Sequence, residues 1–175
     1  MTLPPGLLVR RGRASDAAML ADLAARTFRD AFGAQNTPQN LAQHLASHYS
    51  EEIQAAELAD PGITTLIAEV GDGPAGFAQV ADRTPPPELP ESGGVFLSRF
   101  YLEQSWIGRG VARVLMEAVL DAARERHARY LWLTVWEENP RAVAFYEKSG
   151  FVKSGRTTFV VGEDPQVDWL MTCPL

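Results

Sequence analysis

The chain has 175 residues, 46% of them hydrophobic and 22% charged, with a formal net charge of −6 and one cysteine. A chain of this length can bury roughly 70% of its unfolded surface, so its core needs no disulfide or metal. The single Cys173 excludes a disulfide framework and a cysteine zinc site, and we expect it to be a packed thiol. Residues 1–175 are therefore expected to form one domain.

Charge and hydropathy limit the expected cellular location of the protein and the classes of partner that it binds. No apolar run approaches the ~18 residues of a membrane span, and the first thirteen residues lack the order of a signal peptide. The sequence therefore predicts a cytoplasmic protein with no membrane partner. Sixteen basic residues against twenty-two acidic ones, with no basic run beyond residues 10–13, argue against a nucleic-acid partner. A charge of −6 is compatible with a cationic substrate and equally with ordinary solubility.

The N-terminal part predicts one strand followed by three helices. Ser15 is expected to cap the first helix, Pro38 suits the first turn of the second, and Ser50 is expected to cap the third. Apolar residues at helical spacing support these elements. The expected ranges are 7–11 for the strand and 16–32, 38–49 and 51–59 for the helices.

The rest of the chain alternates strands and helices without a fixed repeat, which predicts a mixed α and β domain. Four prolines within residues 84–90 exclude a helix or central strand there and indicate an exposed loop. Glycine and proline at 71–74 favour a hairpin turn, and the last two expected strands are expected to close the chain as a second hairpin. The expected strands are 64–70, 75–81, 95–102, 130–136, 156–161 and 167–172, and the expected helices are 111–126 and 141–148.

The most informative segment is the turn between the strand at 95–102 and the helix at 111–126. A helix start leaves about four backbone NH groups without partners and attracts anions. Gly108 and Gly110 would let a phosphate approach this helix start closely. The segment lacks the lysine of a Walker loop, and Arg113 stands where a dinucleotide fingerprint has its third glycine. A pyrophosphate site and a turn that needs glycine only for its backbone angles both remain open.

A second segment about thirty residues later narrows this choice. Asn139 is expected to cap a helix with Pro140 at its first position, and Gly150 to end that helix. Asn139 and Tyr146 stand seven residues apart, which is two helical turns, so they share one face of the helix. The start and end of a helix explain Asn139, Pro140 and Gly150 one by one. They do not explain why Asn139 and Tyr146 share one face.

Together the two segments resemble the GCN5-related N-acetyltransferase (GNAT) superfamily, in which a βαβ unit grips acetyl-CoA. Residues 95–151 hold the matching pieces, which are the strand end FYL, the turn IGRGVA and the helix NPRAVAFYEKSGF. The resemblance implies an α/β fold with a mixed, largely antiparallel sheet flanked by helices. Residues 27–58 are also similar to bacterial polyamine acetyltransferases, through TFRDAF, Asn36, Leu41, Tyr49, Ser50 and AEL.

The resemblance implies acetyl-CoA as the cosubstrate and no metal. The backbone of Phe100, Tyr101 and Leu102 would pair with the pantetheine arm, and Asn139 would contact the cofactor nearby. Ile107 is a departure, because the superfamily usually has Gln or Arg at this position. Arg109 or Arg113 would supply the missing cationic contact. Backbone NH groups that would hold the pyrophosphate belong to Gly108, Arg109, Gly110, Val111, Ala112 and Arg113.

Catalytic roles also follow from the resemblance. Tyr146 would lie at the thioester sulfur as the acid that protonates the departing thiolate, and the NH of Leu102 would stabilise the oxyanion. A thioester is already activated, so an amine held in the correct geometry attacks it directly. The sequence identifies no general base, because Phe96 and Thr134 stand where some members of the superfamily carry glutamate.

Other polar and aromatic residues receive structural interpretations. His44 and His48 have a spacing that can bind a metal, but without a third ligand nearby they are expected to form a solvated polar face. Glu137 and Glu138, next to a helix start, are also expected to be solvated. Trp136 is a candidate for the acceptor pocket, since an indole face attracts a cationic amine.

The sequence therefore predicts an N-acetyltransferase that acts on a primary amine, with a small amine or polyamine as the favoured acceptor. Two alternatives remain: acetylation of a protein lysine or N-terminus, and a non-catalytic acyl-CoA-binding sensor. A homodimer is compatible with the sequence. If the acceptor is a polycation, acidic residues should gather around its site, whereas an even scatter of charge indicates ordinary solubility.

Overall fold

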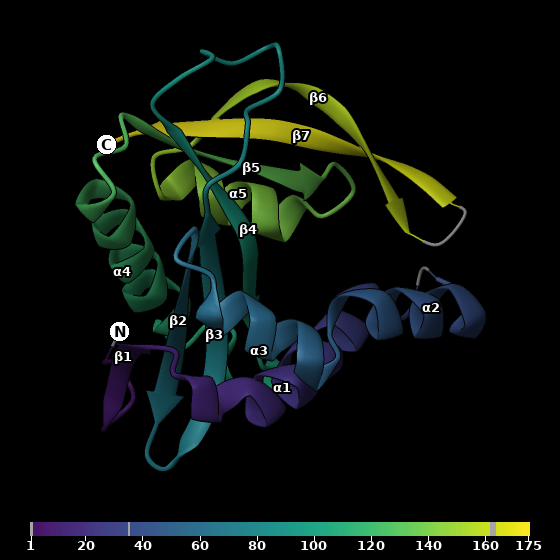
Figure 1. The fold of residues 1–175 in the computed structure, drawn as a ribbon, viewed down its shortest axis with the longest axis vertical. Coiled ribbons are helices and arrows are strands. Elements are labelled where there is room, and N and C mark those ends of the chain that lie inside the picture. Colours follow the sequence, from purple (N-terminus) through teal and green to yellow (C-terminus); the bar gives the residue numbers. More distant parts are fainter. Residues whose placement is uncertain (1, 35, 162–163) are drawn as a thin grey trace.

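The computed structural model describes residues 2–34, 36–161 and 164–175, and it contains one seven-stranded sheet (Figure 1). Neighbouring strands are antiparallel except β4 and β5, which are parallel. The strand order is β1-β2-β3-β4-β5-β7-β6. The strands are β1 (Leu7–Arg11), β2 (Ile63–Val70), β3 (Gly73–Ala81), β4 (Gly94–Leu102), β5 (Tyr130–Trp136), β6 (Val152–Val161) and β7 (Asp164–Pro174).

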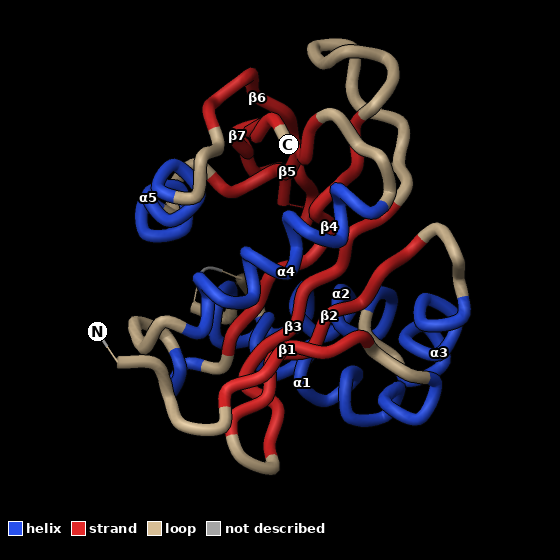
Figure 2. Tube along the Cα trace, turned by 90° about the vertical axis from the view of Figure 1, so that its left-hand side faces the viewer, coloured by secondary structure: helices blue, strands red, loops and turns tan. Residues whose placement is uncertain are grey.

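Helices cover both faces of the sheet (Figure 2). We call the face covered by α1, α2 and α3 the front face, and the face covered by α4 and α5 the back face. Apolar side chains of β2 and β3 alternate between the two, with Ile67 and Phe77 in front and Leu66 and Ala78 behind. The helices are α1 (Ala17–Phe32), α2 (Pro38–His48), α3 (Glu51–Ala59), α4 (Val111–Glu125) and α5 (Pro140–Lys148).

The helix starts follow the sequence with one exception. Thr37 and Ser50 cap α2 and α3, and the Ser50 hydroxyl accepts a hydrogen bond from the backbone NH of Ile53 at 3.3 Å. The expected cap at Ser15 is wrong, because residues 14–16 form a 3₁₀ turn and α1 begins at Ala17, one residue later than expected. In this turn, the Asp16 carboxylate accepts hydrogen bonds from the Arg10 guanidinium.

The C-terminal hairpin is longer than expected. β6 already begins at Val152, because α5 ends at Lys148, Gly150 turns the chain with a left-handed φ of 96°, and the chain then pairs at once with β7. β7 runs to Pro174 because it lies between β5 and β6 and pairs with both. The hairpin prediction is confirmed, although residues 162 and 163 of its turn lie outside the described residues.

A bulge in β4 decides which side chains face front. Gln79 of β3 pairs with Arg99, whereas the next residue, Val80, pairs with Leu97, so Ser98 is an extra residue in β4. The bulge places Arg99 and Tyr101 on the front face and turns the residues between and after them to the back.

Cys173 is buried in the back cluster of apolar side chains, as expected for a packed thiol. In the described part of the chain, no helix combines the length and the apolar character that crossing a lipid bilayer requires.

Candidate active site

The two parallel strands separate soon after they begin. β4 and β5 pair only between residues 94–96 and 130–132, yet β4 continues to Leu102 and β5 to Trp136. We call the space between these strand ends the strand gap. Phe100, Tyr101 and Leu102 lie on the β4 side of the strand gap and pair with β3 on their other side. Their outward backbone groups therefore have the position that an added strand, such as a pantetheine arm, requires.

The start of α4 has the geometry of an anion site. Gly108 and Gly110 both have left-handed backbones, with φ of 78° and 86°. Gly110 is the N-cap residue, and among the described residues no side chain caps the first NH groups of the helix. A Cβ atom at Gly108 would meet nothing within 4 Å, so this glycine serves the backbone angle and leaves open space beside the helix start. These features fit a pyrophosphate.

The two arginines near this helix start differ in their contacts. The Arg109 guanidinium lies 5.5 Å from the centre of the Trp106 ring. Arg113 instead forms an ion pair with Glu117 at 2.6 Å, one turn along α4. Ile107 is partly exposed beside them. Arg109 is therefore the better placed of the two to meet a phosphate, since no carboxylate is paired with it among the described residues.

Tyr146 lies on the back side of the strand gap. Its ring is 9% exposed and packs edge-on against Phe100 of β4 and Phe151, with ring centres 6.2 and 5.6 Å away. Burial raises the pKa of the Tyr146 phenol well above its usual value of 10. The phenol therefore stays protonated at neutral pH, which is the state that a proton donor needs.

Asn139 fixes the start of the helix that carries Tyr146. Its Oδ1 atom accepts a hydrogen bond from the NH of Ala142 at 3.1 Å, and Pro140 is the first helical residue. The cap leaves the amide NH₂ of Asn139 for another partner. The expected cap is confirmed, and the predicted contact with the cofactor stays a prediction.

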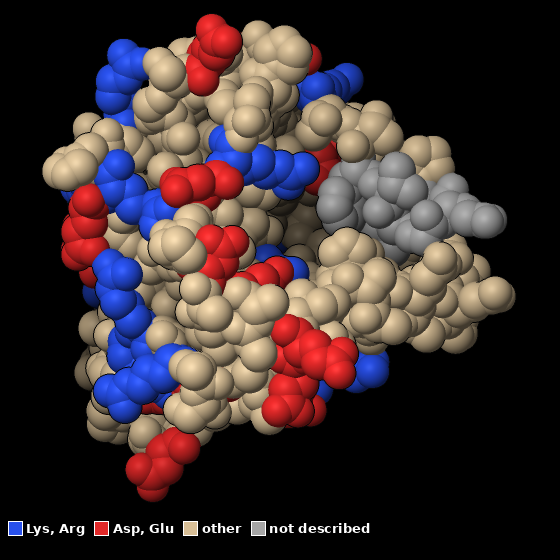
Figure 3. All heavy atoms as spheres, in the orientation of Figure 1, with Lys and Arg blue, Asp and Glu red and all other residues tan. Residues whose placement is uncertain are grey.

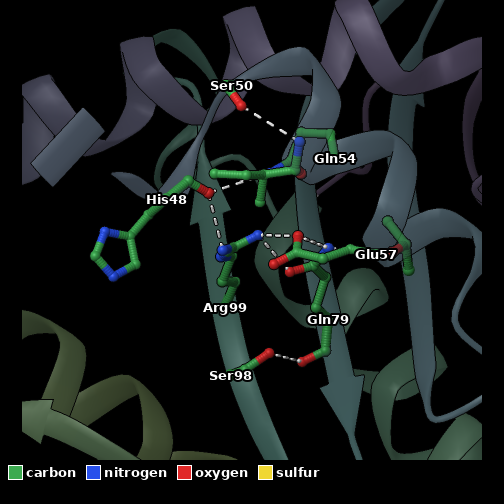
Figure 4. A network of polar contacts seen from close by, with 9 residues as sticks. His48, Ser50, Gln54, Glu57, Gln79, Ser98 and Arg99 are labelled. Carbon is green, nitrogen blue, oxygen red and sulfur yellow. Dashed lines mark hydrogen bonds and ion pairs between the residues drawn. The ribbon is translucent and has the colours of Figure 1, made fainter. Parts of the chain in front are cut away.

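A polar network lies on the front face beside the strand gap (Figure 4). The Arg99 side chain, 12% exposed, forms an ion pair with Glu57 of α3. It also donates hydrogen bonds to Gln79 Oε1 at 2.8 Å and to the backbone carbonyl of His48 at 3.1 Å. The sequence analysis missed this network, although the polar pair Ser98 and Arg99 inside an apolar strand is a signal for it.

Aromatic rings extend this network toward α1 and α2. The Arg99 guanidinium lies 4.7 Å from the centre of the Tyr49 ring. His44 is buried and stacks between Phe28 and His48, with ring centres 4.4 and 4.2 Å away. The expectation of a solvated face is therefore wrong for His44, whose pKa burial lowers to about 4, and holds only for the exposed His48.

Asp168 of β7 is a second residue that the sequence analysis missed. It is 4% exposed and lies opposite Trp136 in the sheet, on the same side as Leu170 and therefore on the front face. Burial raises the pKa of Asp168 to about 6, and the nearby hydroxyl of Thr134 opposes part of this rise. An acidic residue in phase with Leu170 within QVDWLMTC was the available signal.

Charges are mixed on the front face rather than gathered by sign. Figure 3 shows acidic and basic side chains interspersed, with a hollow between α2 and α3 on one side and β5 and β7 on the other. The condition set above for a polycationic acceptor, a concentration of acidic residues around its site, is therefore not met on this face.

Comparison with known proteins identifies the family. A family model described as the acetyltransferase (GNAT) family matches residues 19–151. The chain belongs to this family. An uncharacterized N-acetyltransferase of Lactobacillus delbrueckii subsp. lactis is 32% identical over 83% of this chain and 84% of that protein. Another, from Mycobacterium bovis, is 33% identical over 90% of this chain and 96% of that protein.

Solved structures agree on the fold. The PaiA N-acetyltransferase of Thermoplasma acidophilum in complex with coenzyme A has a TM-score of 0.79 and 16% identity, over 97% of this chain and 99% of that chain. The expected mixed, largely antiparallel GNAT fold is thereby confirmed. Together, the family match and the relatives make this GNAT protein an acetyl-CoA-dependent N-acetyltransferase.

Proposed function

We propose that this acetyltransferase acetylates the primary amine of a small cationic molecule and that the amine enters through the hollow on the front face. The observation that carries the proposal is the hollow itself, which α2 and α3 border on one side and β5 and β7 on the other (Figure 3). A recess bordered on both sides limits the approach of a folded protein, whereas a small molecule can still enter. Trp136, at the end of β5, offers an indole that suits a cationic amine.

The cosubstrate side of the proposal rests on backbone groups. Phe100, Tyr101 and Leu102 would hold the pantetheine arm along the strand gap, and NH groups from Gly108 to Arg113 would hold the pyrophosphate. Bound acetyl-CoA supplies an activated acyl group, so the protein needs no covalent intermediate. The NH of Leu102 would stabilise the negative charge that develops on the carbonyl oxygen.

Tyr146 would act as the acid in this mechanism. Its protonated phenol, at the back of the strand gap, would give a proton to the departing thiolate. A raised pKa makes the resulting phenolate unfavourable, so Tyr146 should promptly recover a proton. The amine nitrogen supplies this proton, because it must lose one when the new C–N bond forms.

Relatives with named substrates support a small cationic acceptor. Streptothricin acetyltransferase of Streptomyces lavendulae is 34% identical over 61% of this chain and 53% of that protein. Spermine/spermidine N(1)-acetyltransferase of Bacillus subtilis is 26% identical over 39% of this chain. The first likeness is the longer, and the mixed charge of the front face gives no separate support to a polyamine.

Release of the coenzyme A thiol tests the proposal. The purified protein with acetyl-CoA would be offered small primary amines, spermidine, and peptides with a free N-terminus or an internal lysine. The proposal predicts saturable thiol release with small amines. Activity confined to the peptides would contradict it, and so would tight acetyl-CoA binding without thiol release for any acceptor.

A further inference from the structure

The acceptor reaches the enzyme as an ammonium ion at neutral pH, because alkyl amines have pKa values near 10. An ammonium cannot attack a carbonyl until it loses a proton. The family resemblance offers no base, since Phe96 and Thr134 occupy the positions where a glutamate is expected. A carboxylate that reaches the strand gap through the fold rather than the sequence is therefore the candidate, and Asp168 is buried opposite Trp136 beside it.

Position favours Asp168. Phe100 of β4 and Trp136 of β5 both lie beyond the last parallel pair, Phe96 with Trp132, so they border the strand gap from its two sides. Asp168 lies directly opposite Trp136 on the next strand. Its side chain points to the front face, from which the proposed acceptor enters, whereas Tyr146 lies behind the strand gap.

The surroundings of the Asp168 carboxylate are unusual for a structural residue. One oxygen, Oδ1, is buried and has no hydrogen-bond partner within the described part of the chain. Thr134 is the diagonal neighbour of Asp168 on the same face of the sheet, since Thr134 pairs with Leu170 and Asp168 pairs with Trp136. Thr134 itself is partly exposed. A buried carboxylate with an unused acceptor destabilises the fold, so its presence calls for a functional reason.

We propose that Thr134 and Asp168 form a proton relay that deprotonates the acceptor ammonium; this inference rests on the proposed function. The ammonium N–H gives its proton to Thr134 Oγ1, while the hydroxyl proton of Thr134 moves to the Asp168 carboxylate. The amine becomes neutral, Thr134 is again an alcohol, and Asp168 is a carboxylic acid that returns its proton to solvent after turnover. The second nitrogen proton, lost as the C–N bond forms, replaces the one that Tyr146 gives to the thiolate.

The neighbouring charges are compatible with this role. Glu137, just after β5, raises the pKa of Asp168 further and is itself paired with Arg156 of β6 at 3.6 Å. On the other side of the strand gap, Arg99 is tied to Glu57. From α2, which contacts β6, the titratable residues are His44 and His48. A pKa of about 6 leaves Asp168 mostly ionised at pH 7, yet basic enough to accept a proton.

The test is the pH dependence of kcat/KM for a small amine that the wild type acetylates. The relay uses the ammonium form, so the wild-type value should be flat between about pH 6 and pH 10 and fall below pH 6. Asp168→Asn should lower kcat/KM about 100-fold at pH 7. The kcat/KM of this variant should then rise about tenfold per pH unit, because the variant can use only the unprotonated amine. Acetyl-CoA affinity and the circular dichroism spectrum should not change.

Three further variants make the test specific. Thr134→Val should reproduce the Asp168→Asn profile, whereas Thr134→Ser should keep the wild-type profile. Glu137→Gln is the control, because it removes a nearby carboxylate that takes no part in the relay. This variant should keep the flat region of the wild-type profile. A wild-type profile in Asp168→Asn would overturn the proposal, and so would a loss that high pH does not rescue, which would indicate charge attraction alone. A wild-type profile in Thr134→Val would overturn the relay.

These outcomes are distinct from failure of the proposed function. If no small amine is acetylated by the wild type, the proposed acceptor class is wrong. If the wild type acetylates a small amine and Asp168→Asn matches it at every pH, only the relay is wrong.

Discussion

Tyr146 and Asp168 lie on opposite faces of the same sheet, at the place where β4 and β5 separate. Tyr146 belongs to the back cluster under α5, and Asp168 follows the front-facing alternation of β7. Burial raises the pKa of both side chains. An acid behind the strand gap and a proton acceptor in front of it suit a reaction in which an amine enters from one side and a thiolate leaves on the other.

The phenol of Tyr146 can be tested by removing its oxygen. We expect Tyr146→Phe to lower kcat more than about tenfold and to leave acetyl-CoA affinity nearly unchanged, because the ring still packs against Phe100 and Phe151. Tyr130→Phe is the matched control. Its hydroxyl donates to the Pro90 carbonyl at the far end of β5, so its loss should leave kcat unchanged. Full turnover in Tyr146→Phe would refute the assignment.

The effect of Gly108 on cofactor binding can be separated from the effect of its left-handed backbone on stability. Gly108 and Gly71 both have left-handed φ angles, of 78° and 62°, and in both cases an added Cβ would meet nothing within 4 Å. Alanine at either position should therefore lower the free energy of unfolding by a similar amount, about 1 kcal/mol. We expect only Gly108→Ala to raise the Kd for coenzyme A, by about tenfold, as measured by calorimetry. Equal affinities in the two variants would place the pyrophosphate elsewhere.

The Arg99 network should matter for stability as well as for the shape of the front face. Glu57→Gln leaves the largely buried Arg99 guanidinium without its anion and should lower the free energy of unfolding by about 2 kcal/mol in urea titrations. Glu117→Gln removes the exposed partner of Arg113, and its effect should stay within about 0.5 kcal/mol. Similar losses in the two variants would show that burial does not strengthen the Arg99 pair.

Asp168 should destabilise the fold at neutral pH. Its pKa of about 6 lies above the ordinary value of 3.8, so the native state binds the proton more tightly than the unfolded state does. The stabilisation that comes from binding this proton is therefore fully present below about pH 4 and is lost as the pH rises through 6. Asp168→Asn should raise the free energy of unfolding at pH 7.5 by up to about 3 kcal/mol, and much less at pH 4.

Asp121→Asn, at an exposed carboxylate on α4, is the control for this effect and should change stability little at either pH. A loss of stability in Asp168→Asn at pH 7.5 would mean that Asp168 has a structural role that outweighs its desolvation. A gain in stability together with the loss of activity predicted above would indicate a residue retained for function.

Local sequence patterns predicted much of the fold. The β5 and α3 ranges follow the sequence to the residue, because an apolar run and a clear Ser50 cap define them. The Ser15 cap failed because Asp16 is held by Arg10, a contact between elements that no local pattern records. The length of β6 depends on its pairing with β7, which is also a non-local property.

The two halves of the site were not equally predictable. Gly108, Gly110, Asn139 and Tyr146 lie within two short local motifs, so sequence reasoning could propose them, and the structure confirms the left-handed glycines and the Asn139 cap. Asp168 stands 22 residues beyond Tyr146, outside both motifs. Only the register between β5 and β7 brings its carboxylate to Thr134. The Arg99 contacts likewise depend on the β4 bulge and on α3, which are distant from one another in the sequence.

A crystal structure of the protein with acetyl-CoA and a small amine inhibitor would test the account most directly. We predict that the pantetheine arm runs along Phe100 to Leu102, that the pyrophosphate meets NH groups from Gly108 to Arg113, and that the sulfur lies within about 3.5 Å of the Tyr146 hydroxyl. The inhibitor nitrogen should lie on the front side, within hydrogen-bond distance of Thr134 Oγ1. A thioester outside the strand gap, or an amine that approaches from the back face, would contradict the account.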